Sequence, residues 1–238
     1  MRPRPAGAYD GSPMKAYLFD LDGTLATSES LKARALAQTC ALYGVEADPL
    51  IYADVMGEDW TTVTGHFFTS CNIDPPRDVF NDRFRGIYLD LLETEVSATA
   101  GAVPFVLSTR ERGIKVGLVS SAASWMVEKV LARLDLKHAF DVVITQEDVV
   151  RHKPDPEAYW LALSGLGVDA TTTLVFEDSL AGLKAAKAAG CRCVAIRHSF
   201  NIRHDFSAAD REIRSFDELA AASSYAPPVA PGDIEPAK

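Results

Sequence analysis

The sequence has little cysteine, no long apolar run and no excess of basic charge. Its four cysteines are too few for a disulfide framework in a chain of 238 residues, and reduced thiols are typical of the cytosol. No apolar run approaches the ~20 residues that cross a bilayer, and the first residues lack the apolar middle of a signal peptide. We therefore expect a cytoplasmic protein without a membrane partner.

Basic residues are outnumbered by acidic ones, 24 to 33, which gives a net charge of -9. This balance argues against nucleic acid and anionic membranes as partners. An anionic substrate would need a metal ion and a few local cations to reverse the sign inside one pocket. The scattered histidines lack metal-ligand spacing, so no zinc site is expected at His66, His138, His198 or His204.

Short apolar runs alternate with helical patterns, which is typical of parallel βαβ units. Runs without polar interruption suit strands that are buried on both faces. Helices are expected near 123–134, 155–165 and 179–189. The expected strands are Ala16–Asp20, Lys115–Ser120, Asp141–Thr145, Thr173–Glu177 and Arg192–Ile196.

About 95 residues separate the first two expected strands, although a βαβ unit takes only about 30. Residues 28–98 are helical in character and predict an inserted cap domain, with small residues at 97–102 as a hinge. The fold class expected is α/β, a Rossmann-like three-layer core with a parallel sheet plus this α-helical cap. The core would comprise 14–27 and 99–220. The ends 1–13 and 221–238 are rich in Pro, Ala, Gly and Ser and are expected to be disordered.

Polar clusters follow four of the expected strands, and the carboxyl ends of parallel strands are where open α/β sheets bind ligands. The first cluster holds Asp20 and Asp22, with Gly23 permitting a sharp turn. One carboxylate could attack phosphorus while the other moves protons. Ser120 and Ser121 follow the second strand, where a hydroxyl and backbone N–H groups suit a phosphoryl group.

Lys153 follows the third strand and could hold phosphate oxygens and the nucleophilic carboxylate. Glu177 and Asp178 close the fourth, and buried acids need a cationic partner, so Asp178 beside Asp20 predicts a Mg²⁺ site. Each cluster alone also suits a helix cap or a solvated loop. Four clusters in order supply everything that phosphoryl transfer demands.

These motifs resemble those of the haloacid dehalogenase-like superfamily: FDLDGTL, LVSSA, HKPDPEAY and FEDSLAG. The resemblance spans about residues 15–219. The helical insertion is similar to the cap of the subgroup that contains β-phosphoglucomutase and phosphoglycolate phosphatase. The resemblance implies a Mg²⁺-dependent phosphatase acting on a small phosphorylated metabolite, as a monomer or dimer.

Carried over by position, the resemblance makes Asp20 the nucleophile and Asp22 the acid/base. It implies Mg²⁺ bound by Asp20, the Asp22 backbone carbonyl and Asp178, with Glu177 beside the ion rather than on it. Ser120 and Lys153 would bind the phosphoryl group, with Ser121 as a further phosphate contact. Asp22 argues against a dehalogenase, which lacks an acid at that position.

Two departures from the family pattern concern the cap. Thr27 stands where many relatives have Asp, which leaves the hinge and substrate contacts open. Residues 56–60 read MGEDW, which lacks the cap lysine of phosphonoacetaldehyde hydrolases and the basic pattern expected of β-phosphoglucomutase. A sugar phosphomutase remains the alternative, since it shares every core residue, and a non-catalytic binding protein is a third possibility.

Two further features have structural interpretations. Cys191 and Cys193 alternate on an expected buried strand, where small apolar side chains are common. Arg83 and Arg85 suit the solvated face of a cap helix. We expect none of these four residues in the site.

Overall fold

The computed structural model describes residues 13–220. The disorder expected at the two chain ends concerns residues outside this range, apart from Pro13. Six parallel strands form one sheet in the order β3-β2-β1-β4-β5-β6 within the described range. The strands are β1 (Ala16–Phe19), β2 (Lys115–Val119), β3 (Val142–Ile144), β4 (Thr173–Glu177), β5 (Arg192–Ile196) and β6 (Arg211–Ile213).

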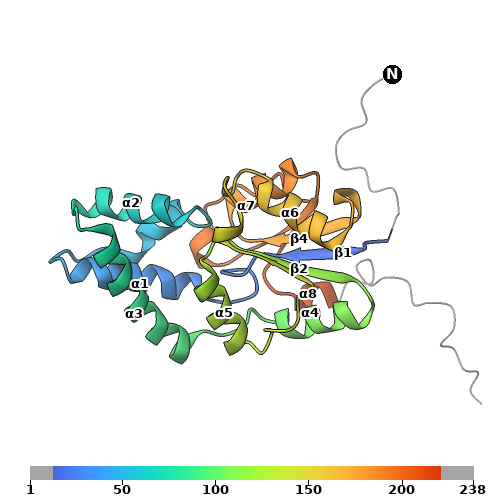
Figure 1. The fold of residues 1–238 in the computed structure, drawn as a ribbon, viewed down its shortest axis with the longest axis horizontal. Coiled ribbons are helices and arrows are strands. Elements are labelled where there is room, and N and C mark those ends of the chain that lie inside the picture. Colours follow the sequence, from blue (N-terminus) through green and yellow to red (C-terminus); the bar gives the residue numbers. More distant parts are fainter. Residues whose placement is uncertain (1–12, 221–238) are drawn as a thin grey trace, which may run out of the picture.

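Helices cover both faces of the sheet, which confirms the three-layer α/β class (Figure 1). One face carries α6 (Glu157–Leu166) and α7 (Leu180–Ala188). The other carries α4 (Ala102–Glu111), α5 (Ser124–Arg133) and α8 (Asp217–Ala220). Burial on both sides explains why β1 and β4 are buried at every residue.

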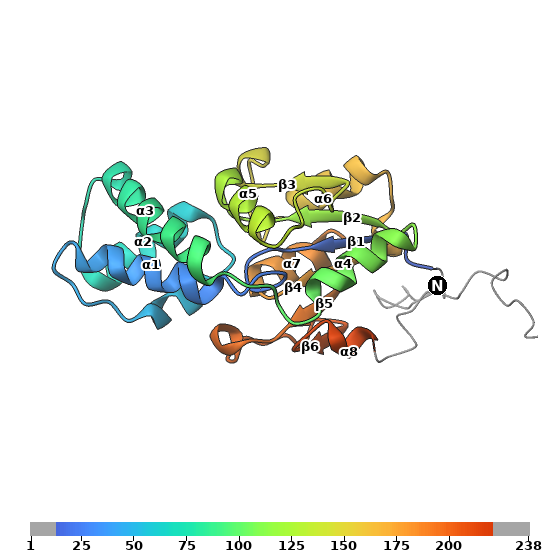
Figure 2. The same ribbon diagram turned by 90° about the horizontal axis from the view of Figure 1, so that it is seen from below.

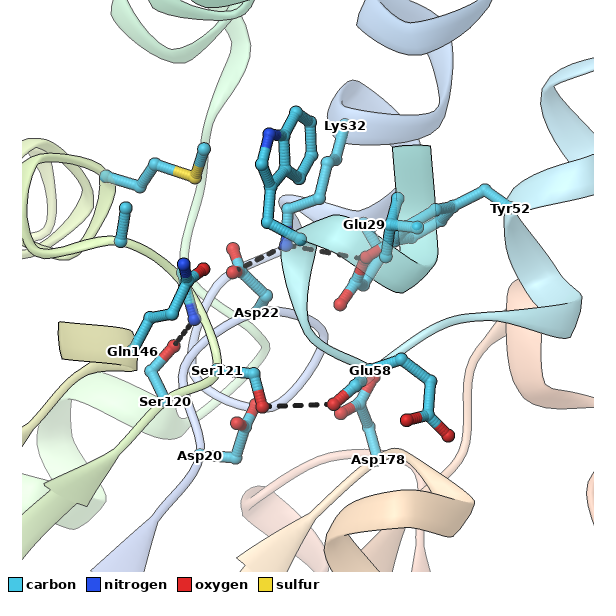
Figure 3. A pocket seen from close by; sticks show the side chains of 16 residues that line it. Asp20, Asp22, Glu29, Lys32, Tyr52, Glu58, Ser120, Ser121, Gln146 and Asp178 are labelled. Atoms are coloured by element: carbon cyan, nitrogen blue, oxygen red, sulfur yellow. Dashed lines mark hydrogen bonds and ion pairs between the residues drawn. The ribbon is translucent and has the colours of Figure 1, made fainter. Parts of the chain in front are cut away.

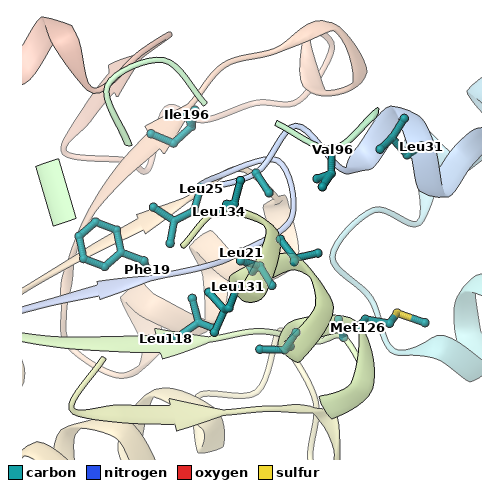
Figure 4. Packing of buried hydrophobic residues seen from close by; sticks show 14 of the residues in the cluster. Phe19, Leu21, Leu25, Leu31, Val96, Leu118, Met126, Leu131, Leu134 and Ile196 are labelled. Atoms are coloured by element: carbon teal, nitrogen blue, oxygen red, sulfur yellow. The ribbon is translucent and has the colours of Figure 1, made fainter. Parts of the chain in front are cut away.

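The apolar core is divided by the sheet into two clusters. Phe19, Leu118 and Leu131 belong to the cluster beneath α4 and α5 (Figure 4). In this cluster Phe19 stacks on Phe176 with ring centroids 4.9 Å apart. Tyr159 belongs to the cluster under α6 and α7. The two clusters hold the strands in register and so fix the positions of the residues that follow them.

The remaining helices lie together beyond the carboxyl ends of the strands (Figures 1 and 2). They are α1 (Glu29–Ala41), α2 (Trp60–Cys71) and α3 (Arg77–Glu95), with a 3₁₀ helix, η1 (Pro49–Asp54), between α1 and α2. The side chain of Asp59 caps α2 by accepting from the Thr61 and Thr62 N–H groups. The α1 helix packs on α3 and on η1.

The chain leaves the sheet and returns to it at one place. Ala26 and Ala98 form an antiparallel bridge, and the Thr27 N–H donates to the Ser97 carbonyl over 2.9 Å. The Thr27 hydroxyl contacts the Ser97 hydroxyl at 2.8 Å. Thr27 therefore joins the two crossing segments in this structure.

The bounds of all five expected strands agree with the structure to within one residue. The structure adds β6, and it forms α4 and α8, which the apolar pattern did not predict. Three further 3₁₀ turns connect these elements, at Gln146–Asp148, Ala170–Thr172 and Ser199–Asn201.

Candidate active site

The order of the strands reverses beside β1, because the chain runs outward through β2 and β3 and then returns to β4 on the other side. Ligands of open α/β sheets bind at such a point, outside the carboxyl ends. Asp20 follows β1 directly, Glu177 ends β4, and Asp178 follows it. One carboxylate oxygen from each of the three lies within 4.8 Å of the others, and all three residues are buried.

Lys153 joins two of these acids. Its Nζ lies 2.8 Å from Asp20 Oδ1 and 2.5 Å from Glu177 Oε1, and it also donates to the Val119 carbonyl over 3.0 Å. Burial opposes the charge on this ammonium group, but the nearby Asp20 and Glu177 carboxylates raise the pKa of Lys153 above its ordinary value. Lys153 is therefore a fixed cation beneath Asp20.

Both carboxylate oxygens of Glu177 are filled by donors from the protein. Oε1 accepts from Lys153 and from the Tyr159 hydroxyl at 2.9 Å. Oε2 accepts from the N–H groups of Asp178 and Ser179 and from the Ser179 hydroxyl. That Glu177 lies beside a metal ion rather than binding it stays a prediction.

Asp178 has partners that the sequence interpretation missed. Its Oδ2 lies 2.8 Å from His198 Nε2, and its backbone carbonyl accepts from the Asn201 side chain at 2.9 Å. His198 lies just past the end of β5, so the rule that directed attention to the other strand ends would have found it. Burial, followed by the charges of Glu29 and Glu177, raises the pKa of Asp178 well above its ordinary value.

Gly23 allows Asp178 to approach the loop after β1. It has a φ of +77°, and a Cβ on it would lie 2.0 Å from Asp178 Oδ2. A side chain at residue 23 would therefore both strain the backbone and displace the carboxylate. The FDLDGT motif requires glycine here for a packing reason as well as a conformational one.

The acids at this edge fit a divalent cation. Burial raises the pKa of Asp20, with Lys153 opposing the shift and Glu177 and Asp178 adding to it. Raised pKa values for Asp20 and Asp178 mean that negative charge is undercompensated here. Buried carboxylate oxygens are the ligands that Mg²⁺ prefers.

Asp22 is held by the start of α1. The Ser28 hydroxyl donates to its Oδ1. Lys32 Nζ lies 2.7 Å from its Oδ2 (Figure 3). Lys32 Nζ also lies 3.9 Å from Glu29 Oε2. The sequence interpretation missed Lys32 and Glu29, although two charged residues one turn apart, close to the first motif, were a signal that was available.

A pocket joins the sheet edge to the helices (Figure 3). Asp20, Asp22, Ser120 and Asp178 line it from the sheet side, whereas Lys153 and Glu177 lie beneath it. The lining from the helical side includes Glu29, Lys32, Tyr52, Glu58 and Trp60. The structure thus brings the four predicted clusters together.

The two serines differ in their contacts. Ser120 Oγ accepts from the Ala122 N–H at 3.1 Å. The Ser121 hydroxyl donates to the Gly57 carbonyl at 3.0 Å, so it contacts the loop before α2 (Figure 3). A phosphate contact by Ser121 stays a prediction.

The residues that were set aside lie away from these carboxylates, with the exception of His198. His66 is 3.9 Å from Asp54, and the Ala53 carbonyl accepts from His204 Nε2 at 3.1 Å. Arg83 and Arg85 lie over the rings of Tyr43 and Trp125. The four cysteines, Cys40, Cys71, Cys191 and Cys193, are buried and free.

Comparison with known proteins gives consistent results. The haloacid dehalogenase-like hydrolase family matches residues 17–196. Protein CbbY of Cereibacter sphaeroides is 33% identical over 222 residues, covering 87% of this chain and 94% of that protein. Hexitol phosphatase B of Escherichia coli is 31% identical over 210 residues, covering 87% and 94%. CbbY from Rhodobacter sphaeroides in complex with phosphate has a TM-score of 0.78 at 30% identity, covering 87% and 96%.

The fold and the site together define an α/β protein with a Rossmann-like parallel sheet and buried carboxylates at the edge where such sheets bind ligands. The sequence matches show that the chain belongs to the haloacid dehalogenase-like hydrolase family. Within that family it is a phosphatase of the subgroup similar to β-phosphoglucomutase and phosphoglycolate phosphatase.

Among the described residues, no helix combines the length and the apolar character needed to cross a membrane.

Proposed function

We propose that this phosphatase hydrolyses a small phosphomonoester, of the sugar phosphate or phosphoglycolate type, with Mg²⁺ and through a phospho-aspartate at Asp20. The observation that carries the proposal is the arrangement around Asp20. Lys153 engages its Oδ1 at 2.8 Å, while Asp20 lines the pocket beside Asp178. A relative named phosphorylated carbohydrates phosphatase, from Thermotoga maritima, is 33% identical over 193 residues and supports the substrate class.

In the first step, a carboxylate oxygen of Asp20 attacks phosphorus and the bond from phosphorus to the ester oxygen breaks. Asp22, in its protonated form, gives its proton to the departing oxygen, which leaves as an alcohol. In the second step, Asp22 takes a proton from water, whose oxygen attacks phosphorus and releases inorganic phosphate and the Asp20 carboxylate. Lys32 and Ser28 hold the Asp22 side chain in place through both steps.

Asp20, Asp178 and the backbone carbonyl of Asp22 would hold Mg²⁺, which when bound neutralises charge on the transferring phosphoryl group. Lys153 supplies a fixed positive charge on the same side. Ser120, at the end of β2, would donate to a phosphoryl oxygen. Glu177 keeps Lys153 aimed at Asp20, since it binds the same ammonium group.

Residues 28–98 would act as the cap domain that covers the substrate and excludes water. Support comes from the contacts that this segment makes with the sheet side of the pocket. Ser121 donates to Gly57, and Tyr88 lies edge-on to Trp125 with ring centroids 6.4 Å apart. Substrate choice would then depend on residues of α1 and of the loop before α2.

The test is a phosphate-release assay over metabolite monophosphates with Mg²⁺, run beside Asp20→Asn. We expect Mg²⁺-dependent release, and a loss of at least about 10³-fold in the variant because an amide is a poor nucleophile. Circular dichroism should show that the variant is folded. Equal activity in both proteins would disprove the nucleophile, and isomerisation of a sugar phosphate that requires added sugar bisphosphate would show a mutase.

A further inference from the structure

The charges that line the pocket limit what the substrate can carry besides its phosphoryl group. We propose that the remainder of the substrate is uncharged and bears hydroxyl groups, so that monophosphates of neutral sugars or polyols are accepted whereas bisphosphates and carboxylate-bearing phosphates are disfavoured. This inference rests on the proposed function and deepens it.

Among the described residues that line the pocket, Lys32 is the one with a basic side chain. It is already committed, because its Nζ lies 2.7 Å from Asp22 and 3.9 Å from Glu29, and its side chain is only 9% exposed. To bind a second anion, Lys32 would have to leave the buried carboxylates of Asp22 and Glu29 without their cation. The other cation of the site, Lys153, lies beneath Asp20 on the phosphoryl side.

The helical side of the pocket adds negative charge. Glu58, in the loop before α2, lines the pocket and is half-buried (Figure 3). Burial, followed by the neighbouring Asp59, raises the pKa of Glu58, and Lys184 on α7 opposes the shift. Lys184 is exposed, and it already compensates Glu58 in part. A carboxylate or a second phosphate near Glu58 would meet like charge.

The same lining suits hydroxyl groups. The carboxylate of Glu58 accepts hydrogen bonds, and the side-chain amide of Gln146 can both donate and accept. Trp60 uses its indole N–H on Asn81 at 2.9 Å, so the ring itself is what it offers to the pocket. An aromatic surface with a few polar groups is typical of sites for small polar ligands.

This charge pattern bears on two alternatives that the sequence left open. A phosphoglycolate carries a carboxylate on its remainder, and a phosphomutase cycle passes through a sugar bisphosphate. Both would place a second anion opposite Glu58 and Glu29. A CbbY variant from Rhodobacter sphaeroides, 29% identical with a TM-score of 0.79, has been solved with xylulose-(1,5)bisphosphate, so we expect the two proteins to differ in preference.

The test compares kcat/KM with Mg²⁺ for a hexitol monophosphate, phosphoglycolate and a sugar bisphosphate. We expect kcat/KM for the hexitol monophosphate to exceed that for either of the other two compounds by at least about 10-fold, which corresponds to about 1.4 kcal/mol. Glu58→Gln should narrow that ratio by several-fold. The control Glu46→Gln makes the same change in net charge at an exposed residue outside the pocket lining, and should leave the ratio unchanged.

Equal or better turnover of phosphoglycolate or the bisphosphate would overturn this inference while leaving the phosphatase function intact. So would an unchanged ratio in Glu58→Gln. If none of the three compounds, nor any other monophosphate, releases phosphate, the proposed function itself fails and the inference fails with it.

Discussion

Asp20 and Asp22 lie two residues apart, yet the structure gives their carboxylates different partners. Asp20 contacts Lys153, which comes from the segment after β3. Asp22 contacts Ser28 and Lys32, which belong to the start of α1. The proposed nucleophile is thus held by the sheet side of the molecule, and the proposed acid/base by the helical side.

Lys32→Met should destabilise the protein. The change leaves Asp22 and Glu29 buried without their cation, which costs about 3–5 kcal/mol in typical buried ion pairs. The free energy of unfolding is measured by urea denaturation, monitored by circular dichroism. Lys129→Met, at an exposed residue of α5, is the matched control and should change it by less than about 0.5 kcal/mol. Equal values for both variants would show that the buried pair has no net importance.

Asp178→Asn should stabilise the metal-free protein near neutral pH. The folded-state pKa of Asp178 is raised, so its contribution to stability is fully present below its unfolded pKa and is lost as the pH rises through its folded pKa. The amide carries no charge and escapes that loss. Thermal unfolding in EDTA, scanned from acidic to neutral pH, should show a smaller decline in the variant than in the wild type. A steeper decline in the variant would contradict the assignment.

At the scale of elements, the loop before α2 connects the helical segment to the sheet. Gly57 has a φ of +86°, and a Cβ on it would lie 2.4 Å from the Ser179 side chain. Gly57 also supplies the carbonyl that accepts from Ser121. The loop can therefore approach the ends of β2 and β4 closely only because residue 57 has no side chain.

Gly57→Ala should lower kcat/KM by at least about 10-fold, because it pushes the loop off Ser179 and misplaces the pocket wall. Gly65→Ala, inside α2 with open space around the added methyl group, is the control. It should keep full activity and gain up to about 1 kcal/mol in unfolding free energy. Steady-state kinetics on both variants checks the prediction. Similar activity in the two would mean that the loop contact is dispensable.

Five of the strands and the α/β class could be predicted because strands covered on both faces have uninterrupted apolar sequences. The strand β6 is only three residues long and reads REI, so it has no such run. The helix α4 contains Pro104 near its start and follows a stretch of small residues that suggested only a hinge. Both form because the neighbouring sheet supplies the partners that their own sequences do not specify.

The candidate site could be predicted where a motif marks the end of a strand, as for Asp20, Lys153 and Asp178. Glu58 could not, because its importance comes from the way the helical segment folds over the sheet edge. For Lys32, the signal in the sequence was a pair of charged residues one turn apart, close to the first motif. His198 was accessible to the same reasoning as the motifs, because it lies just past the end of β5 with Arg197 and Ser199 as polar neighbours. Whether such residues belong to the site depends on contacts between segments far apart in the sequence rather than on the local sequence pattern.

At the scale of the whole molecule, the proposed Mg²⁺ site predicts that stability depends on the cation, because Asp20 and Asp178 are buried beside other acids. Mg²⁺ at 100 times its dissociation constant should add about 2.7 kcal/mol to the unfolding free energy. For a chain of this size that is a rise of about 5–10 °C in Tm. Differential scanning calorimetry with Mg²⁺ and with EDTA measures it, and Asp178→Asn should remove most of the difference. An equal rise in Asp178→Asn would place the ion elsewhere.

The bridge between Ala26 and Ala98 has an evolutionary consequence. Because the intervening chain starts and finishes at neighbouring points, it can be lengthened, shortened or replaced without moving either end, and the entropy of closing a loop grows only slowly with its length. Evolution can therefore change the substrate specificity of such a protein by exchanging one continuous stretch of the gene. The proposed catalytic groups Asp20, Asp22 and Lys153 lie outside that stretch.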